Sequence, residues 1–429
     1  MPAHHRVPYF FRGIVWGLLV AASLVAVGCG TDSRPPVQTG AEILAANGFE
    51  SLSGERVGLI VNHTAQVDTA HLIDRVERAN SVELGALFGP EHGLRGTAGA
   101  GEAVESDRDA RTGAPVHSLY GDTRQPTQQM LSGLDALVFD VQDVGARFYT
   151  YITTMGLAMQ AAAEANVRFV VLDRPNPLGG TYTSGFILEP EHQSFVGRYP
   201  LPVAHGMTVG EIARFIKGER LLPGLDSLAL SVVEMNGWRR SMQWPDTQRE
   251  WPAPSPNLPT WETALVYPGM AFFEAVDVNE GRGTERPFLQ VGFPWPRGDV
   301  RAIADTLRAR SLPGLAIDTV QFTPQARTGA PAPRYDGDAL PGVRLRITDR
   351  TAVQPVEAGL HALHAAYQQA QARGDSNFVS RPEHLTRLAG TERVLDLLEQ
   401  GESAGALAAE WTNDVEEFRD RRRPYLLYE

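Results

Sequence analysis

Cysteine is almost absent from this 429-residue chain, whose one thiol belongs to Cys29. A disulfide framework and a CxxC metal or redox site are therefore excluded. Basic residues are also few, because 39 Lys and Arg residues stand against 51 Asp and Glu residues, for a formal net charge of −12. A nucleic-acid-binding protein normally carries a basic stripe, and this sequence has only short basic runs such as 421–423. We therefore expect no nucleic-acid partner.

The sequence also lacks the motifs of several large enzyme classes. It has no HExxH zinc motif, no GxSxG nucleophile turn and no Walker phosphate loop. A Gly-Arg-Gly turn at 281–283 lacks the strand-to-helix setting of GxGxxG, so we expect no dinucleotide site.

What remains is an ordinary globular composition, with 43% hydrophobic and 21% charged residues. These proportions are not those of a disordered, collagenous or coiled-coil chain. The length is too great for one small core and indicates two domains.

The N-terminus has the pattern of an export signal. Arg6 and Arg12 precede an apolar run at 13–27, which is shorter than the roughly 20 residues that a membrane-spanning helix needs. A positive flank, a short apolar stretch and small residues before a break are typical of secretory signals.

The end of this run, VAVGC at 25–29, resembles the processing site of bacterial lipoproteins, in which the cysteine is lipidated. Ala26 departs from the pattern, since leucine is usual there. We predict a lipoprotein signal peptide at 1–28, lipidation of Cys29 and a polar tether at 29–41, hence an exported, membrane-anchored lipoprotein facing the periplasm or cell wall. A plain membrane anchor and an ordinary cleaved signal are the alternatives.

Short apolar runs alternate with helical patterns in the first half of the chain. Strands that are apolar along their whole length indicate a parallel sheet covered on both faces, and therefore an α/β fold. We expect strands at 56–61, 84–88, 134–141, 167–172 and 228–234, and helices at 68–80, 146–166 and 208–222. Thr208 and Glu211 have the spacing of a capping box.

Polar residues gather directly after four of these strands, at Asn62, Glu91, 140–143 and 173–176. Ligands of open α/β sheets bind in the crevice outside the carboxyl ends of the strands. The simpler interpretation is that Asp, Asn, Gly and Pro make turns there. Four such clusters at one sheet edge favour a binding site.

Residues 236–261 differ from the rest, because they hold four of the seven tryptophans and five prolines. The prolines exclude regular structure. The rings either stack on the apolar faces of sugars or pin the loop to the core, and composition does not separate these two possibilities.

A second, smaller α/β pattern follows. We expect strands at 288–293, 315–322 and 343–348 and helices at 300–309 and 355–373, which places the domains at 42–260 and 261–429.

The candidate chemical groups are carboxylates. Glycoside hydrolysis needs a protonated carboxyl that donates to the leaving oxygen, often with a second carboxylate as base or nucleophile. A partly buried glutamate suits the acid role. The candidates are Glu91, Asp140, Asp143, Asp173 and Glu280. With His63, His92 and His205 the same groups would instead bind a divalent metal, although none has the spacing of a metal site.

At these residues the chain resembles the DUF1343 family, whose characterised members are exo-β-N-acetylmuramidases of the NamZ type. The resemblance covers about residues 42–429. The matching stretches are GLIVNHTA (58–65), ALFGPEHGLRG (86–96), TGAPVHSLYG (112–121), LVFDVQDVGARFYTYITTM (137–155), VLDRPNPLGG (171–180), HGMTVGEIA (205–213), PSPNLP (254–259), YPGMAFFE (267–274), NEGRGTERPF (279–288) and RRPYLLYE (422–429).

The resemblance implies a Rossmann-like domain followed by a smaller α/β domain, with an active-site cleft between them. It implies an enzyme without a cofactor that releases N-acetylmuramic acid (MurNAc) from the non-reducing ends of peptidoglycan fragments such as MurNAc-GlcNAc. Glu91 aligns with the glutamate regarded as catalytic in the family, and we assign it as general acid, with Glu280 as second carboxylate.

The remaining candidates would bind the sugar. Bidentate arginine pairs suit the lactyl carboxylate that distinguishes MurNAc from N-acetylglucosamine, although each arginine is equally a candidate for a structural ion pair. These arginines are Arg95, Arg174 and Arg282. Candidate partners for hydroxyl and acetamide groups are Asn62, His92, Gln142, Asp143, Asn176, His205 and Asn257.

Two other functions stay open at this point. The chain would serve as a lipid-anchored muropeptide-binding protein without turnover, or as a metal-dependent hydrolase of cell-wall fragments. In each case the lipid is the only expected contact with a membrane.

Overall fold

The structure is a computed structural model that describes residues 1–5, 8, 35–91, 93–94, 108–121, 123–327, 331–401 and 404–429. The chain divides into Met1–Pro35 and a compact unit, Pro36–Glu429, and the fold described below is that of the second unit. None of the helices in the described residues is long and apolar enough to cross a membrane. The predicted apolar signal segment and Cys29 lie outside the described residues.

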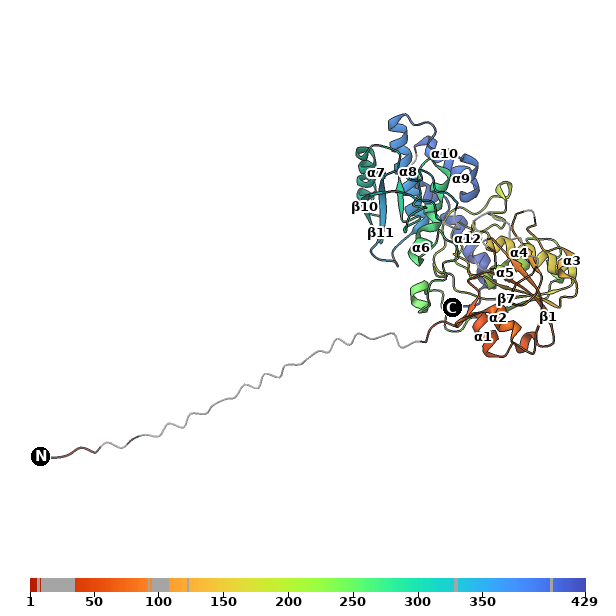
Figure 1. Ribbon diagram of the computed structural model, residues 1–429. Coiled ribbons are helices and arrows are strands. Elements are labelled where there is room, and N and C mark those ends of the chain that lie inside the picture. Colours follow the sequence, from red (N-terminus) through yellow and green to blue (C-terminus); the bar gives the residue numbers. More distant parts are fainter. Residues whose placement is uncertain are drawn as a thin grey trace. The chain divides into compact units, whose positions relative to one another are not determined.

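A six-stranded sheet in which every pairing is parallel forms the first domain (Figure 1). Its spatial order is β5-β4-β1-β6-β7-β8. The strands are β1 (Arg56–Val61), β4 (Glu83–Gly89), β5 (Val116–Ser118), β6 (Ala136–Asp140), β7 (Arg168–Leu172) and β8 (Leu230–Val233). The predicted α/β class and all five predicted strands are confirmed. The edge strand β5 was not predicted, because its three half-buried residues contain no apolar run.

Helices cover both faces of this sheet (Figure 1). On one face lie α1 (Gly40–Ala46) and α2 (Leu72–Glu77), and on the other α3 (Gln128–Leu131), α4 (Tyr151–Ala165) and α5 (Val209–Gly218). Each face has its own apolar core, which explains why the inner strands are apolar throughout. The capping box of α5 is present: Glu211 N donates to Thr208 Oγ1, and Thr208 N donates to Glu211 Oε2.

Two predicted helices begin later in the structure than expected, and the helix expected at 208–222 ends at Gly218. The helix expected at 68–80 begins at Leu72, because a small hairpin of β2 (Gln66–Val67) and β3 (Ala70–His71) occupies the preceding residues. The helix expected at 146–166 begins at Tyr151. Its expected first residues instead form a β-bridge of Ala146 with Ala204 and then a turn, in which Tyr149 N donates to Ala146 O.

The second domain contains an antiparallel sheet of order β10-β11-β9. Its strands are β9 (Gln290–Gly292), β10 (Leu315–Phe322) and β11 (Leu340–Ile347), and its first helices are α6 (Trp261–Met270), α7 (Arg297–Arg310) and α8 (Pro355–Arg373). All three predicted strands and both predicted helices are confirmed. Helix α6 was not predicted, because it follows a proline-rich loop and contains Pro268.

Helices α6 and α8 cross at two glycines. A Cβ atom on Gly359 would lie 2.2 Å from the carbonyl carbon of Gly269, so neither position has room for a side chain. The close crossing fixes α6 and the 3-10 helix that follows it, Ala271–Ala275. Both segments contribute to the cavity described below.

The chain ends with α9 (Pro382–Ala389), α10 (Arg393–Gln400), α11 (Ala404–Glu410) and α12 (Thr412–Arg422). Its last residues return to the first domain. Tyr428 OH donates to Asp173 Oδ2 at 2.6 Å, and Arg422 Nη1 donates to His205 O at 2.8 Å. The C-terminal segment of the predicted domain 261–429 therefore packs on the Rossmann-like sheet, which helps to explain why residues 36–429 form one compact unit.

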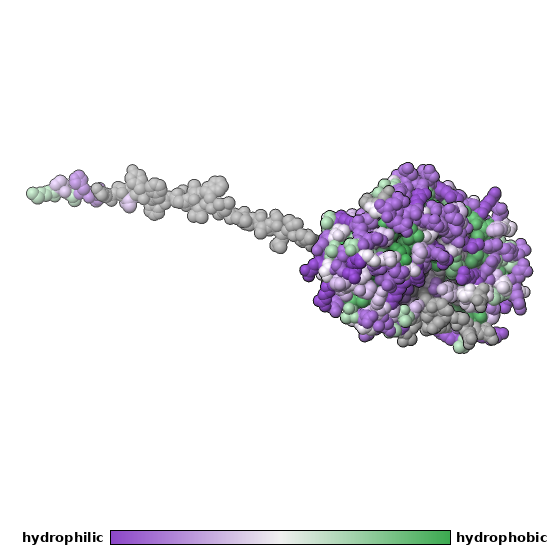
Figure 2. Space-filling model, turned by 90° about the horizontal axis from the view of Figure 1, so that it is seen from above, coloured by the Kyte–Doolittle hydropathy of each residue, from purple (hydrophilic) through white to green (hydrophobic). Residues whose placement is uncertain are grey.

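The remaining short elements are 3-10 turns at Glu50–Leu52, Pro190–His192, Leu225–Ser227, Trp244–Thr247 and Arg423–Tyr425. The surface seen in Figure 2 is mostly hydrophilic, with apolar residues exposed in small areas.

Candidate active site

A cavity of about 420 Å³ is lined by residues of both domains. The first domain supplies the segments that follow β4, β5 and β6, and the second supplies α6, α9 and the residues around the Gly-Arg-Gly turn. Lining residues are Glu91, Tyr120, Arg124, Phe148, Tyr149, Thr150, Ser194, Phe195, Val196, Ser255, Asn257, Tyr267, Glu274, Arg282, His384, Arg387 and Leu388.

Glu91 lies on the wall of this cavity, two residues after the end of β4. Thr150 Oγ1 donates a hydrogen bond of 2.8 Å to Glu91 Oε2, and the Tyr120 hydroxyl is also hydrogen-bonded to Glu91. Burial, together with the neighbouring Glu91 charge, raises the pKa of Tyr120 to about 12. Tyr120 is thus a protonated donor at neutral pH, and two hydroxyls orient the Glu91 carboxyl.

Aromatic rings form a second part of the wall. Tyr267 from α6 makes edge contacts with Phe148 and Tyr149, at centroid distances of 5.4 and 6.1 Å. Burial raises the pKa of Tyr149 and Tyr267 well above the ordinary value, so both remain neutral. Neutral rings offer the apolar surface on which the C–H face of a sugar packs.

A charged group lies on the side of the second domain. Arg282 Nη2 is 2.7 Å from Glu274 Oε1, and Arg282 Nε is 3.2 Å from Glu280 Oε1. His384 Nε2 is 3.3 Å from the other oxygen of Glu274. Burial raises the pKa of Glu274, but the charge of Arg282 and the bond from His384 outweigh it, so the net shift is downward.

Glu280 differs from Glu274 in position and in protonation. Its side chain is only 8% exposed, it does not line the cavity, and burial raises its pKa despite Arg282. The turn that holds these groups needs Gly281, whose φ is +83° and whose Cβ would lie 2.6 Å from Arg286 O. The carboxylate that faces the cavity from this group is Glu274.

Most of the predicted polar residues after the strands form a buried hydrogen-bonded network. Thr64 Oγ1 accepts from Gln142 N, and Gln142 Nε2 donates to Pro175 O, so the ends of β1, β6 and β7 are joined at one edge, as the sequence predicts. None of these side chains lines the cavity: Asn62, Gln142, Asp143, Asn176 and His205.

Their partners are within the protein. Asn62 Nδ2 donates to Tyr151 OH, Asn176 Nδ2 donates to Met207 O, and His205 Nε2 lies 3.5 Å from Asp143 Oδ2. The network supports the loops that carry Glu91 and Thr150.

Arg174 is also buried away from the cavity. Its Nε and Nη2 atoms lie 2.5 and 2.9 Å from the two oxygens of Asp140, and the side chains of both residues are at most 3% exposed. Because this bidentate ion pair occupies the guanidinium, Arg174 has the structural ion-pair role that the sequence analysis left open.

The tryptophan-rich loop is held by hydrogen bonds to main-chain carbonyls. Trp244, Trp251 and Trp261 donate to the carbonyls of Arg249, Leu258 and Pro177. None of the four predicted rings lines the cavity, whereas the loop contributes Ser255 and Asn257. Of the two possibilities for these rings, the structure favours anchoring of the loop.

Among the described residues, the carboxylate and imidazole groups that come close enough for a metal are those of Glu189, Glu191 and His192. This group lies at the turn Pro190–His192 and includes no candidate from the sequence analysis. Thr391 Oγ1 already donates to Glu189. His92 and Arg95 lie outside the described residues.

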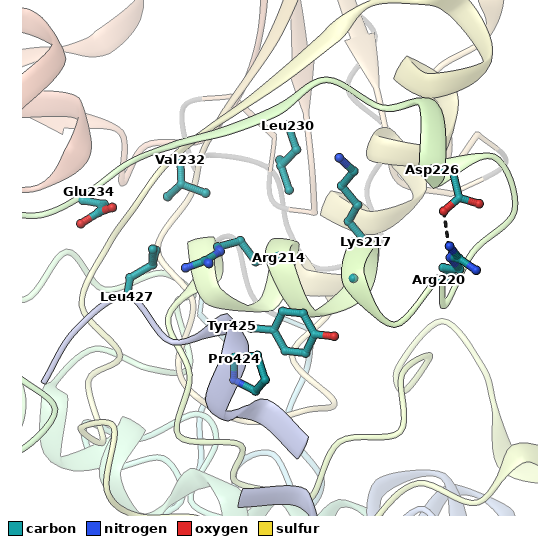
Figure 3. Close-up of a pocket in the computed structure, with 11 residues that line it drawn as sticks. Arg214, Lys217, Arg220, Asp226, Leu230, Val232, Glu234, Pro424, Tyr425 and Leu427 are labelled. Atoms are coloured by element: carbon teal, nitrogen blue, oxygen red, sulfur yellow. Dashed lines mark ion pairs between the residues drawn. The ribbon is translucent and has the colours of Figure 1, made fainter. Parts of the chain in front are cut away.

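A larger cavity, of about 710 Å³, lies at the outer edge of the sheet (Figure 3). It is lined by α5, β8 and the C-terminal tail. Arg220 pairs with Asp226 there at 2.9 Å, and Lys217 lies in the last turn of α5, where a cation stabilises the helix dipole. None of the predicted site residues that the structure describes lines it, and we place the candidate site in the cavity of about 420 Å³.

Sequence reasoning gave no role to several residues of this cavity, namely Tyr120, Arg124, Thr150, Phe195, Tyr267, Glu274 and His384. Four of them, Tyr120, Thr150, Tyr267 and Glu274, lie within the motif stretches quoted above. They carried no separate signal, because an aromatic or hydroxyl side chain near a strand or helix end has many structural roles.

An α/β protein in which carboxylates and tyrosines line a cavity between two domains has the features of a sugar-active enzyme. Comparison with known proteins identifies the family to which this chain belongs. Family models described as the N-terminal and C-terminal parts of exo-β-N-acetylmuramidase NamZ match residues 57–262 and 265–428. The chain belongs to this family, as its motifs indicate.

Individual relatives agree. The chain is 40% identical over 423 residues to the peptidoglycan β-N-acetylmuramidase NamZ of Bacillus subtilis (strain 168), covering 96% of this chain and 98% of that protein. Crystal structures of two DUF1343 family proteins from Bacteroides fragilis are similar in fold. One has a TM-score of 0.83 and 34% identity, covering 92% of this chain and 100% of that chain. The other has a TM-score of 0.75 and 32% identity, covering 92% and 99%.

Proposed function

We propose that this protein is an exo-acting β-N-acetylmuramidase that releases MurNAc from the non-reducing ends of peptidoglycan fragments during cell-wall turnover and recycling. Family membership over nearly the whole of residues 57–428 supports the substrate class. The observation that carries the proposal is the placement of Glu91, a carboxyl held by Thr150 and Tyr120 on the wall of a cavity that the carboxylate of Glu274 also lines.

Glu91 acts as the general acid in this proposal. Its carboxyl donates a proton to the glycosidic oxygen as the bond from that oxygen to the anomeric carbon breaks, and a water molecule supplies the hydroxyl that ends on MurNAc. The proton released from water restores the Glu91 carboxyl. The positive charge that develops on the sugar ring is stabilised by an ionised carboxylate, and Glu274 is the group with that character, because its pKa is lowered.

Glu280 has a supporting part in this scheme. It lies behind Arg282 and shares that guanidinium with Glu274. Glu274 therefore takes the place that the sequence analysis gave to Glu280.

The test uses the soluble chain from residue 30 onward with MurNAc-GlcNAc disaccharide and a chromogenic β-MurNAc glycoside. Release of free MurNAc, with the corresponding GlcNAc glycoside inert, is the expected result. Saturable binding of the disaccharide without release would instead favour the muropeptide-binding protein, and loss of activity on exhaustive chelation would favour the metal-dependent hydrolase.

We further propose that the protein is an exported lipoprotein attached through Cys29. The apolar run at 13–27 and the VAVGC sequence at 25–29 support this localisation, which would place the enzyme on a membrane facing the cell wall. Labelled palmitate should be incorporated into the wild-type protein and not into Cys29→Ser. Equal labelling of both would contradict lipidation at this residue.

A further inference from the structure

The basic side chains of the cavity differ in how they are paired. Arg282 lies between Glu274 and Glu280, and His384 faces Glu274 from the other side. Arg387 Nη2 lies 3.3 Å from Glu383 Oε2. Each of these three side chains therefore already has a carboxylate of the protein as its partner.

Arg124 has a different environment. Its guanidinium carbon lies 4.6 Å from the centroid of the Phe195 ring, and its Nε donates to Gly121 O at 3.3 Å. Among the described residues, no carboxylate forms an ion pair with it. A guanidinium stacked on a ring keeps its outer N–H groups free in a fixed plane. Within the part of the chain that the structure describes, Arg124 thus has no ion-pair partner, and it lies on the cavity wall against the Phe195 ring.

Arg124 also lies on the same side of the cavity as Glu91. The rings of Phe195 and Tyr120 have centroids 6.3 Å apart. The charge of Glu91 raises the pKa of Tyr120 and the charge of Arg124 lowers it, so both groups lie close to the Tyr120 hydroxyl. A sugar that presents its glycosidic oxygen to Glu91 therefore has Arg124 at the edge of the same subsite.

We infer that Arg124 is the specificity-determining residue that binds the lactyl carboxylate of MurNAc. This inference rests on the proposed function. The carboxylate is the one charged group that distinguishes MurNAc from N-acetylglucosamine, and a free, planar guanidinium is the group that binds it in a bidentate manner. Of the arginines nominated from the sequence, Arg174 and Arg282 are already paired within the protein.

The experiment measures kcat/KM on two chromogenic β-glycosides, one of MurNAc and one in which the lactyl carboxylate is replaced by its primary amide. In the Arg124→Gln variant, kcat/KM should fall about 10- to 100-fold on the carboxylate substrate, which is the range for a hydrogen-bonded charged pair. On the amide substrate kcat/KM should fall less than about threefold. Arg124→Lys should recover part of the loss, since it restores the charge without the planar fork.

Arg387→Gln is the matched control, because Arg387 lines the same cavity and is paired with Glu383. It should affect both substrates alike. Equal losses of Arg124→Gln on the two substrates would show that Arg124 is merely structural, and a wild-type enzyme that does not prefer the carboxylate would also overturn the inference.

Failure of the proposed function gives a different result. If the wild-type protein hydrolyses neither glycoside, calorimetric binding of MurNAc and of its lactyl amide replaces the kinetic readout. Tighter binding of MurNAc by the wild type, lost in Arg124→Gln, would then retain Arg124 as the carboxylate site of a binding protein. Equal affinity of the wild-type protein for MurNAc and for its lactyl amide would show that Arg124 is not a carboxylate-binding residue.

Discussion

Thr150 stands at the N-cap of α4, yet its hydroxyl forms no capping bond and instead donates to Glu91 Oε2 at 2.8 Å. A threonine at this position normally accepts from a main-chain N–H of the first turn, which stabilises the helix by roughly 1 kcal/mol. Helix α4 forgoes that bond, and the hydroxyl orients a carboxyl 59 positions earlier in the chain. The arrangement favours the geometry of Glu91 over the stability of α4.

Replacing Glu91 tests the general-acid role directly. Glu91→Gln should lower kcat on MurNAc-GlcNAc by about 10³-fold, because the sugar leaving group needs a proton in the transition state. On a dinitrophenyl β-MurNAc glycoside the loss should be much smaller, since that leaving group departs without protonation. An equal fall of kcat on the two substrates would show that Glu91 does not act as the general acid.

The control for this variant is Glu262→Gln, an exposed carboxyl near the start of α6. It should leave both rates unchanged. Near-wild-type turnover of Glu91→Gln on the disaccharide would remove Glu91 from the mechanism.

Replacing Thr150 separates positioning from binding. Thr150→Val keeps the side-chain shape and removes the donor, so kcat should fall roughly tenfold, the cost of about one hydrogen bond, with KM nearly unchanged. Thr150→Ser should restore the rate, because it returns the hydroxyl. A rise of KM with unchanged kcat in the valine variant would indicate that Thr150 contacts the sugar instead.

The buried pair of Arg174 and Asp140 should behave as a structural element. Arg174→Met leaves an uncompensated carboxylate, and removing one partner of a buried pair costs about 3–5 kcal/mol. Denaturant unfolding at pH 7 measures this loss. The folded fraction should keep its preference for the carboxylate substrate over its amide, and a selective loss on the carboxylate would return Arg174 to the list of substrate ligands.

The sequence predicts the sheet well and the cavity only in part. Strands such as 56–61 and 167–172 are apolar throughout because both of their faces are buried, and this pattern is readable without any tertiary information. The short strand β5 has no such pattern and was missed, although Tyr120 follows it closely in the chain.

The cavity depends on contacts that no local pattern records. Glu91 was found because it is a carboxylate after a strand, but Tyr267 and Glu274 reach the same cavity only through the close crossing of α6 and α8 at Gly269 and Gly359. Arg174 and Arg282 were equal candidates in the sequence, since a guanidinium does not reveal its partner. Only the placement of Asp140 and Glu274 shows that both are already paired.

The pairing of Arg282 with Glu274 should also appear in the pH dependence of stability. The pKa of Glu274 is lowered from its ordinary value of 4.5, so the group stabilises the folded state above pH 4.5 and this contribution is lost as pH falls through its folded pKa. Glu280 has a raised pKa and acts in the opposite sense, with a contribution that is present below pH 4.5 and lost as pH rises.

Arg282→Gln removes the largest cause of the lowered pKa of Glu274, while His384 and Arg381 remain beside it. The variant should therefore lose about 2 kcal/mol of unfolding free energy at pH 7. The difference from wild type should shrink as pH falls through the folded pKa of Glu274, which lies below 4.5, because that carboxyl is then protonated. Denaturant unfolding at pH 7 and at a series of pH values below 4.5 measures it, with the exposed Arg301→Gln as control. A difference that stays constant across this range would mean that Arg282 stabilises the fold by packing alone.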